Sequence, residues 1–225
     1  MDYGSGSTVK DDALSNDGTL KPGSSGTTTT TGMWSDNSKI GSNCLDFDGQ
    51  DDYVEIAHSP ELVDNSHLTI AVWINPQEYP KSYDTTFRPI VHKGSSSNWE
   101  YQLTRRSGSG STGSDNQVYF GIDNDAASIY DSLPISSWSS ITGEYHHLVG
   151  KFDGISGTLE VFWDGSKVLE KNMSVDSTPD RNGTLKLGWD GDTSSDRYQP
   201  AELDEVRIYD RPLSTPEIKA LYELQ

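Results

Sequence analysis

Acidic side chains gather in two short segments of the chain. Four aspartates lie within residues 46–52, and Asp204 is followed directly by Glu205. Carboxylates held close together raise one another's pKa unless a cation neutralises them. Ca²⁺ suits such a place because it binds several carboxylate, carbonyl and water oxygens in flexible geometry. The alternative, that these are solvated acids in turns, stays open at this point.

Aromatic residues near polar loops and strand ends form a second group. Flat aromatic faces beside acids, amides and arginines are surfaces on which sugar rings stack. The residues predicted to bind a ligand are Trp99, Tyr101, Trp189, Asp190, Arg197 and Tyr198. For Trp189 the pattern allows a second interpretation equally well, in which the ring fills a wider core.

The net charge of the chain indicates which kinds of partner to expect. The 225 residues carry 35 acids against 17 bases, a net charge of −18. Nucleic acids and anionic membranes require clustered Lys and Arg, so we expect neither as a partner. The excess of acid fits cation binding, but it equally fits a solubility coat or adaptation to a saline habitat.

The sequence also bears on localisation. We find no apolar run long enough to span a membrane and no charged-then-apolar leader, so we expect no membrane insertion. Residues 172–174 and 182–184 fit the N-glycosylation pattern. We therefore expect a secreted or cell-surface module, part of a larger polypeptide or assembly.

Short runs that alternate apolar and polar residues predict an all-β chain. After a Gly-, Ser- and Thr-rich stretch over 1–43, strand patterns separated by turn residues continue over 44–213. Leu45–Gly49 and Tyr53–Ile56 are predicted to pair with each other, and Asp164-Gly165 predicts a tight hairpin. A capping box at Ser214 predicts a short helix over 214–223. We expect one domain, 1–225, with two antiparallel sheets.

The further strands are predicted at Leu68–Trp73, Pro89–Lys93, Trp99–Thr104, Val118–Ile122, His146–Phe152, Leu159–Trp163, Val168–Lys171, Leu185–Trp189 and Leu203–Tyr209. The Ser- and Gly-rich stretch Ser107–Ser114 is predicted as a long hairpin tip.

Four segments in order resemble the LamG-like (laminin G, concanavalin A-like) domain family. They are LDFDGQDDYVEI over 45–56, TIAVWINP over 69–76, EYHHL continuing to the Asp-Gly hairpin over 144–165, and LDEVRIYDRPLS over 203–214. The resemblance implies a concanavalin A-like jelly-roll sandwich. It also implies a structural Ca²⁺ held by Asp11, Asn16, Gly18, Asp48, Gly49 and Asp204.

Such domains have several functions, and the fold alone does not choose among them. Laminarinase-type β-glucanases share the sandwich and carry a Glu-x-Asp-x-x-Glu strand, whereas here Glu202 and Asp204 are followed by Arg207. The missing acid removes the carboxylate pair that glycoside hydrolysis needs, so we expect no enzyme.

The first hypothesis is therefore a non-catalytic carbohydrate-binding module that binds a polysaccharide and a structural Ca²⁺. The alternative is a structural or adhesion domain of a cell-surface, appendage or virion protein that contacts other proteins. An atypical polysaccharide hydrolase or lyase is a third possibility. Solvent-facing rings in a row favour the first, and a broad exposed apolar patch favours the second.

Overall fold

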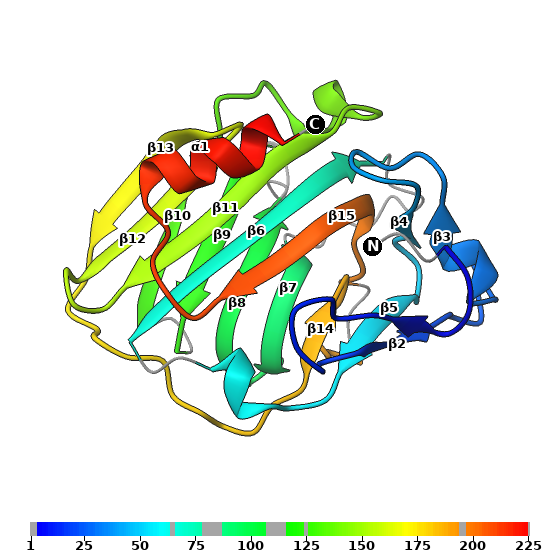
Figure 1. Cartoon of the computed structure of the whole chain (residues 1–225), viewed down its shortest axis with the longest axis horizontal. Coiled ribbons are helices and arrows are strands. Elements are labelled where there is room, and N and C mark those ends of the chain that lie inside the picture. The colour runs from blue at the N-terminus through cyan, green and yellow to red at the C-terminus, as the bar shows by residue number, and fades with distance from the viewer. Residues whose placement is uncertain are drawn as a thin grey trace.

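Two antiparallel sheets face each other across a shared apolar core (Figure 1). The computed structural model describes residues 4–63, 66–77, 87–106, 116–123, 126–193 and 197–224. The predicted all-β, concanavalin A-like jelly-roll sandwich with a short C-terminal helix is confirmed.

Eight of the strands form one sheet. In spatial order they are β1 (Thr8–Val9), β2 (Gly18–Lys21), β5 (Tyr53–Ile56), β14 (Leu185–Leu187), β7 (Phe87–Ser95), β8 (Asn98–Arg106), β9 (Gln117–Ile122) and β10 (Ala127–Ser132).

The other sheet has seven strands. In spatial order they are β13 (Ser166–Asn172), β12 (Thr158–Trp163), β11 (His146–Asp153), β6 (His67–Pro76), β15 (Pro200–Tyr209), β4 (Cys44–Asp48) and β3 (Trp34–Ser35). The helices are η1 (Thr31–Met33), η2 (Pro60–Leu62) and η4 (Trp138–Ile141), all of 3₁₀ type, and α1 (Thr215–Glu223).

The predicted pairing of the first two strand segments is wrong. β4 pairs with β15 and β3 in the seven-stranded sheet, whereas β5 pairs with β2 and β14 in the eight-stranded sheet. Gly49 has a φ of +74°, a conformation that favours glycine, and it lies against Pro200. The turn after Asp48 therefore carries the chain from one sheet to the other instead of closing a hairpin.

Other local predictions are confirmed. Asp164 and Gly165 have φ values of +48° and +73° and join β12 to β13, as a tight hairpin turn requires. Ser214 and Glu217 form the predicted capping box of α1. In α1, Ile218 is fully buried against the outer face of the seven-stranded sheet.

The glycine-rich N-terminal part was predicted as loop, but it contributes β1, β2 and β3 to the sheet edges. β10 was also missed because its sequence, Ala127–Ser132, alternates weakly. The predicted hairpin tip Ser107–Ser114 lies outside the described residues.

Candidate functional site

A row of polar residues crosses the outer face of the eight-stranded sheet. Strand register aligns Lys186 of β14 with His92 of β7, and His92 with Gln102 of β8. The neighbours of Gln102 along β8, Tyr101 and Leu103, belong to the core. Because side chains alternate along a strand, the row faces away from the core.

Aromatic rings lie at the β9 end of this row, where Gln102 pairs with Gly121. Trp99 and Tyr119 meet edge to face with centroids 6.2 Å apart, and Tyr119 meets Phe87 in the same way at 5.9 Å. A Cβ at Gly121 would lie 2.5 Å from the Tyr119 hydroxyl oxygen and 2.8 Å from the Trp99 ring. Gly121 thus leaves the space that both rings occupy.

A second ring cluster lies at the opposite end of the row, beside β14 and β5. Trp189 lies between Tyr53 of β5, with centroids 4.7 Å apart, and Tyr198, on which it stacks at 5.4 Å with planes 9° apart. Its indole Nε1 is buried and has no hydrogen-bond partner among the described residues. An unpaired buried donor is costly, so the indole of Trp189 is a polar group that the folded chain leaves unsatisfied.

Charged groups complete the site. Arg197 pairs with Asp190 at 2.9 Å, and its guanidinium lies 5.8 Å from the centre of the Phe87 ring. Burial lowers the pKa of His92 to about 4, so its imidazole is neutral at pH 7. Burial also lowers the pKa of Lys186, whose Nζ donates to Thr184 Oγ1 at 2.7 Å and to the Gly94 carbonyl at 3.2 Å.

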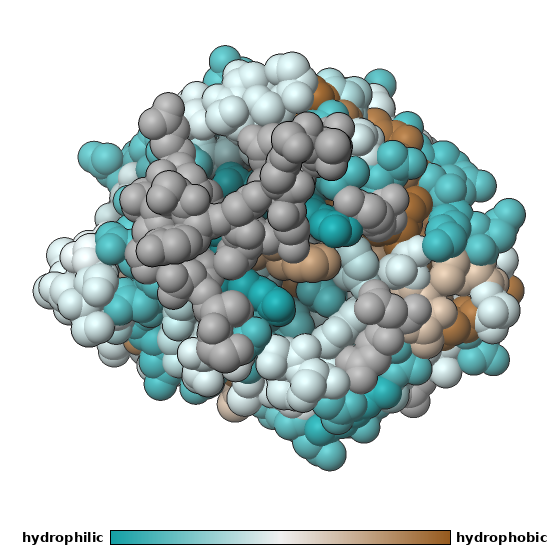
Figure 2. Space-filling model, turned by 180° about the vertical axis from the view of Figure 1, so that it is seen from behind, coloured by the Kyte–Doolittle hydropathy of each residue, from teal (hydrophilic) through white to brown (hydrophobic). Residues whose placement is uncertain are grey.

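Figure 2 shows this face from behind, with a hollow near its middle where hydrophilic and weakly hydrophobic residues are visible. The rings are mostly packed against one another: Trp99 is 6% and Trp189 8% exposed, while Phe87, Tyr53 and Tyr198 are half-buried. The face is therefore a hollow with rings at its sides, not a flat row of solvent-facing rings.

Five of the six predicted ligand residues lie in this site, and Tyr101 does not. Its ring is 1% exposed in the core, its hydroxyl donates to the Leu62 carbonyl at 3.0 Å, and burial raises its pKa. A bulge between Lys93 and Gly94 shifts the register against β8. Trp99 and Tyr101 share a parity in the sequence, but the bulge places them on opposite faces.

The site also contains residues that the sequence did not predict: Tyr53, Phe87, His92, Gln102, Tyr119 and Lys186. Because side chains alternate along a strand, Tyr53 lies on the outer face, opposite the core residue Val54. Only the order of the strands brings Tyr53 next to Trp189.

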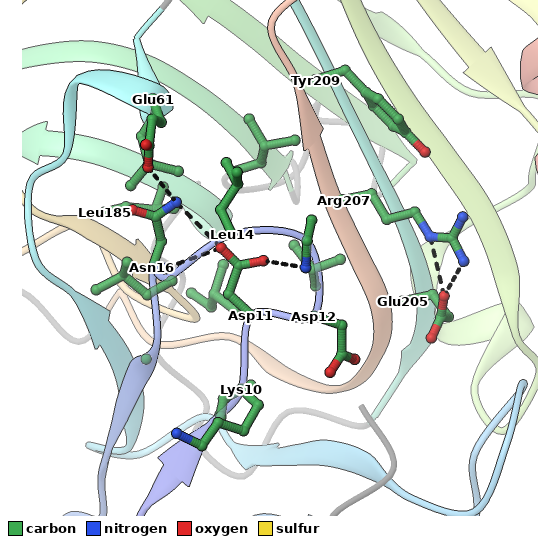
Figure 3. Close-up of a pocket in the computed structure, with 18 residues that line it drawn as sticks. Lys10, Asp11, Asp12, Leu14, Asn16, Glu61, Leu185, Glu205, Arg207 and Tyr209 are labelled. Atoms are coloured by element: carbon green, nitrogen blue, oxygen red, sulfur yellow. Dashed lines mark hydrogen bonds and ion pairs between the residues drawn. The ribbon is translucent and has the colours of Figure 1, made fainter.

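The residues predicted to hold Ca²⁺ fall into separate hydrogen-bond groups. Asp11 accepts from the backbone N–H groups of Ala13 and Asn16, both at 3.0 Å, and lines a pocket together with Asn16 and Gly18 (Figure 3). Asp48 instead accepts from the Gln50 N–H at 2.8 Å, directly beside Gly49.

The third group is Asp204, which accepts from the N–H groups of Lys39 and Ile40 at 3.0 and 2.9 Å. Within the described ranges, no three His, Cys, Asp or Glu side chains form a group that could hold a metal ion. The six residues thus do not make one coordination site as placed, and Ca²⁺ stays a prediction.

The acidic segment around Asp48 nevertheless contains two carboxyl groups whose pKa values are raised. Burial and the charge of Asp48 raise the pKa of Asp52 to about 8, and its Oδ1 is buried without a hydrogen-bond partner among the described residues. Burial, Glu202 and Asp48 together raise the pKa of Asp46 to about 6. These are the residues at which a cation would relieve the most repulsion.

The carboxylates of the glucanase-like strand are engaged in structural contacts. Glu202 accepts from Asn75 Nδ2 at 2.7 Å, from Asn37 Nδ2 at 2.6 Å and from Ser35 Oγ at 2.8 Å. Together with Asp204 it fixes the segment 35–40 over the outer face of the seven-stranded sheet. These acids therefore lie on the face opposite the ring-lined hollow.

The two facing antiparallel sheets and the C-terminal helix define a jelly-roll β-sandwich. The family profile described as the concanavalin A-like lectin/glucanases superfamily matches residues 48–219, so the chain belongs to this family. No curated protein matches the chain in sequence.

Several solved structures share the fold. The binding domain of Paraclostridial Mosquitocidal Protein 1 has a TM-score of 0.65 at 14% identity, covering 96% of this chain and 50% of that one. The botulinum neurotoxin serotype D binding domain has a TM-score of 0.65 at 14% identity, covering 93% and 47%. A SAP-like pentraxin from Limulus polyphemus has a TM-score of 0.51 at 18% identity, covering 71% and 70%.

The chain thus spans about half the length of these toxin binding domains. Among the described residues, no helix is both long and apolar enough to cross a membrane.

Proposed function

We propose that the chain is a non-catalytic, extracellular carbohydrate-binding module whose ligand lies in the hollow of the eight-stranded sheet. The observation that carries this proposal is the stack of Tyr53, Trp189 and Tyr198 beside an unpaired buried indole N–H. Carbohydrate sites combine aromatic faces with a few fixed polar groups. Lys186, His92 and Gln102 supply those groups along the same face.

The comparisons support a binding role. One structure of this fold is the botulinum neurotoxin DC binding domain in complex with SialylT, and another is that domain in complex with rat synaptotagmin II. The first favours a glycan and the second a protein. The large apolar residues that are exposed in the described part of this chain, Leu14, Ile155 and Leu224, lie in three separate segments and form no broad patch. The glycan is therefore the better-supported ligand.

Replacing Tyr198 by alanine is expected to weaken polysaccharide binding by about tenfold or more, equivalent to about 1.4 kcal/mol. The reason is the loss of the half-buried ring that stacks on Trp189. The thermal unfolding midpoint is measured with a panel of soluble polysaccharides, because a ligand that binds only the native state raises it.

Tyr222→Ala is the matched control, since Tyr222 stacks on Trp73 with centroids 5.6 Å apart on the other sheet. It should keep the polysaccharide shift in full. An equal loss of the polysaccharide-induced midpoint shift in both variants would contradict the proposed site. If no polysaccharide of the panel shifts the midpoint of the wild type, the adhesion alternative is favoured.

Ca²⁺ at the acidic segment 46–52 remains part of the proposal. Support comes from the raised pKa values of Asp46 and Asp52, since a cation favours the charged form of both. The thermal midpoint is expected to rise by several degrees when Ca²⁺ is added after EDTA, and Asp52→Asn should reduce that rise. An identical midpoint in EDTA and in Ca²⁺ would remove the metal from the proposal and leave the glycan site untouched.

A further inference from the structure

β15 has a partner on both sides along only half of its length. Pro200–Leu203 pair with β4, whereas the ladder with β6 continues to Tyr209. Within the described residues, no strand pairs with Val206–Tyr209 on the β4 side. A bulge between Asp204 and Arg207, with Glu205 at a φ of +47°, separates the two halves. The second half of β15 therefore pairs with β6 on one side only. Its other side, where β4 would lie if it continued, is an open strand edge within the described residues.

A pocket of about 510 Å³ lies along this open edge (Figure 3). Its walls come from both sheets and from residues 10–16. The wall residues that belong to or pack against the core are Val9, Ile56, Leu62, Leu185, Leu187, Val206 and Ile208. Packed interiors hold few voids larger than a water molecule. This pocket is an extension of the core that the described residues leave unfilled.

The register of β15 sets how an added strand would lie. Ile208 pairs with the core residue Ile70, whereas Arg207 pairs with Ala71, which belongs to the cluster under α1. A strand hydrogen-bonded to this edge would follow the same alternation. Every second side chain would enter the pocket, and the others would face the outer side of the sheet.

The charged residues at the rim of the pocket indicate which charge the added strand should carry. The carboxylates there are Asp11, Asp12, Glu61 and Glu205, whereas the bases are Lys10, paired with Asp17, and Arg207, paired with Glu205. The excess of acid favours a basic residue at an end of the occupant.

We propose that the open edge of β15 accepts an antiparallel β-strand from another polypeptide, with apolar residues at alternate positions and a basic residue at an end. Main-chain hydrogen bonds to an exposed edge supply affinity in this mode of recognition, and pockets for alternate side chains supply specificity. The site lies apart from the glycan hollow, so the two proposals stand or fall separately.

The test uses the 225-residue chain and a short synthetic peptide that alternates valine with threonine between terminal lysines. Peptide binding is followed by calorimetry and by hydrogen exchange of the Val206–Tyr209 amides. We expect saturable binding and slower exchange at those of these amides that point away from β6. A peptide with N-methyl groups on the amides of one edge keeps its side chains but cannot pair, and should bind about tenfold more weakly or worse.

Ile208→Asp should abolish binding, and Leu169→Asp on the edge strand β13 is its matched control, because both residues are half-buried against the core. The N-methyl peptide keeps the test decisive if a variant fails to fold. Absence of binding, or equal binding of both peptides, would overturn the proposal. The proposal would also be overturned if these amides became more protected as the protein concentration rises without peptide. A second copy of the chain would then occupy the edge.

Discussion

Replacing Lys93 by alanine is expected to lower the free energy of unfolding by about 3–5 kcal/mol, as when one partner of a buried ion pair is removed. Lys93 Nζ lies 2.9 Å from Glu100 Oε2, and both side chains are fully buried. The ammonium also donates to the Gly183 carbonyl at 2.7 Å. The variant leaves the Glu100 carboxylate buried without its cation. Chemical denaturation of wild type and variant measures the difference.

Two further variants control this result. Lys93→Met combined with Glu100→Gln removes both charges and keeps an oxygen to accept from the Gly183 N–H, so at least half of the loss should be recovered. Lys219→Ala breaks the exposed pair with Glu223 and should cost less than about 1 kcal/mol. A loss below about 1 kcal/mol in Lys93→Ala would show that the pair is not held as described.

Stability in EDTA is expected to fall as pH rises toward 8, and Asp52→Asn should remove most of that fall. The folded-state pKa of Asp52 is raised from 3.8 to about 8, first by burial and then by Asp48. Between these values the folded state binds the proton more tightly than the unfolded state, so each added pH unit removes up to about 1.4 kcal/mol. Denaturation between about pH 6.5 and 8.5 measures the slope.

The buried histidines act in the opposite direction in the lower part of this window, because burial lowers the folded-state pKa values of His92 and His147 from 6.5 to about 4 and only the unfolded state binds their protons there. The comparison of wild type with Asp52→Asn cancels this contribution, because the variant keeps both histidines. Asp36→Asn, at an exposed aspartate, is the matched control and should leave the slope unchanged. Ca²⁺ bound at this segment should flatten the slope of the wild type. A slope that Asp52→Asn does not change would show that another group carries the proton.

Local sequence patterns predicted most of the strands, the Asp164-Gly165 hairpin and the capped helix, because each depends on neighbouring residues. The partner strands of β4 and β5 could not be predicted in this way. Alternation marks Leu45, Phe47 and Val54 as core residues whether their strands pair or lie in different sheets. Only the backbone turn at Gly49 decides between the two arrangements.

The site shows the same limit. Loop position and residue type predicted Trp99, Trp189, Asp190, Arg197 and Tyr198, but a single bulge at Gly94 turned Tyr101 into the core. Tyr53, Phe87 and Tyr119 lie on strands distant in sequence, and their contact with the site depends on strand order. That information is contained in no local pattern.

The most direct test of the glycan proposal is an NMR titration that follows the indole Nε1–H signal of Trp189, assigned with Trp189→Phe, as polysaccharide is added. We expect this signal to shift saturably while the indole signal of Trp73, under α1 on the other sheet, stays in place. A titration in which a binding polysaccharide leaves the Trp189 signal unmoved, or moves that of Trp73 instead, would contradict the glycan proposal.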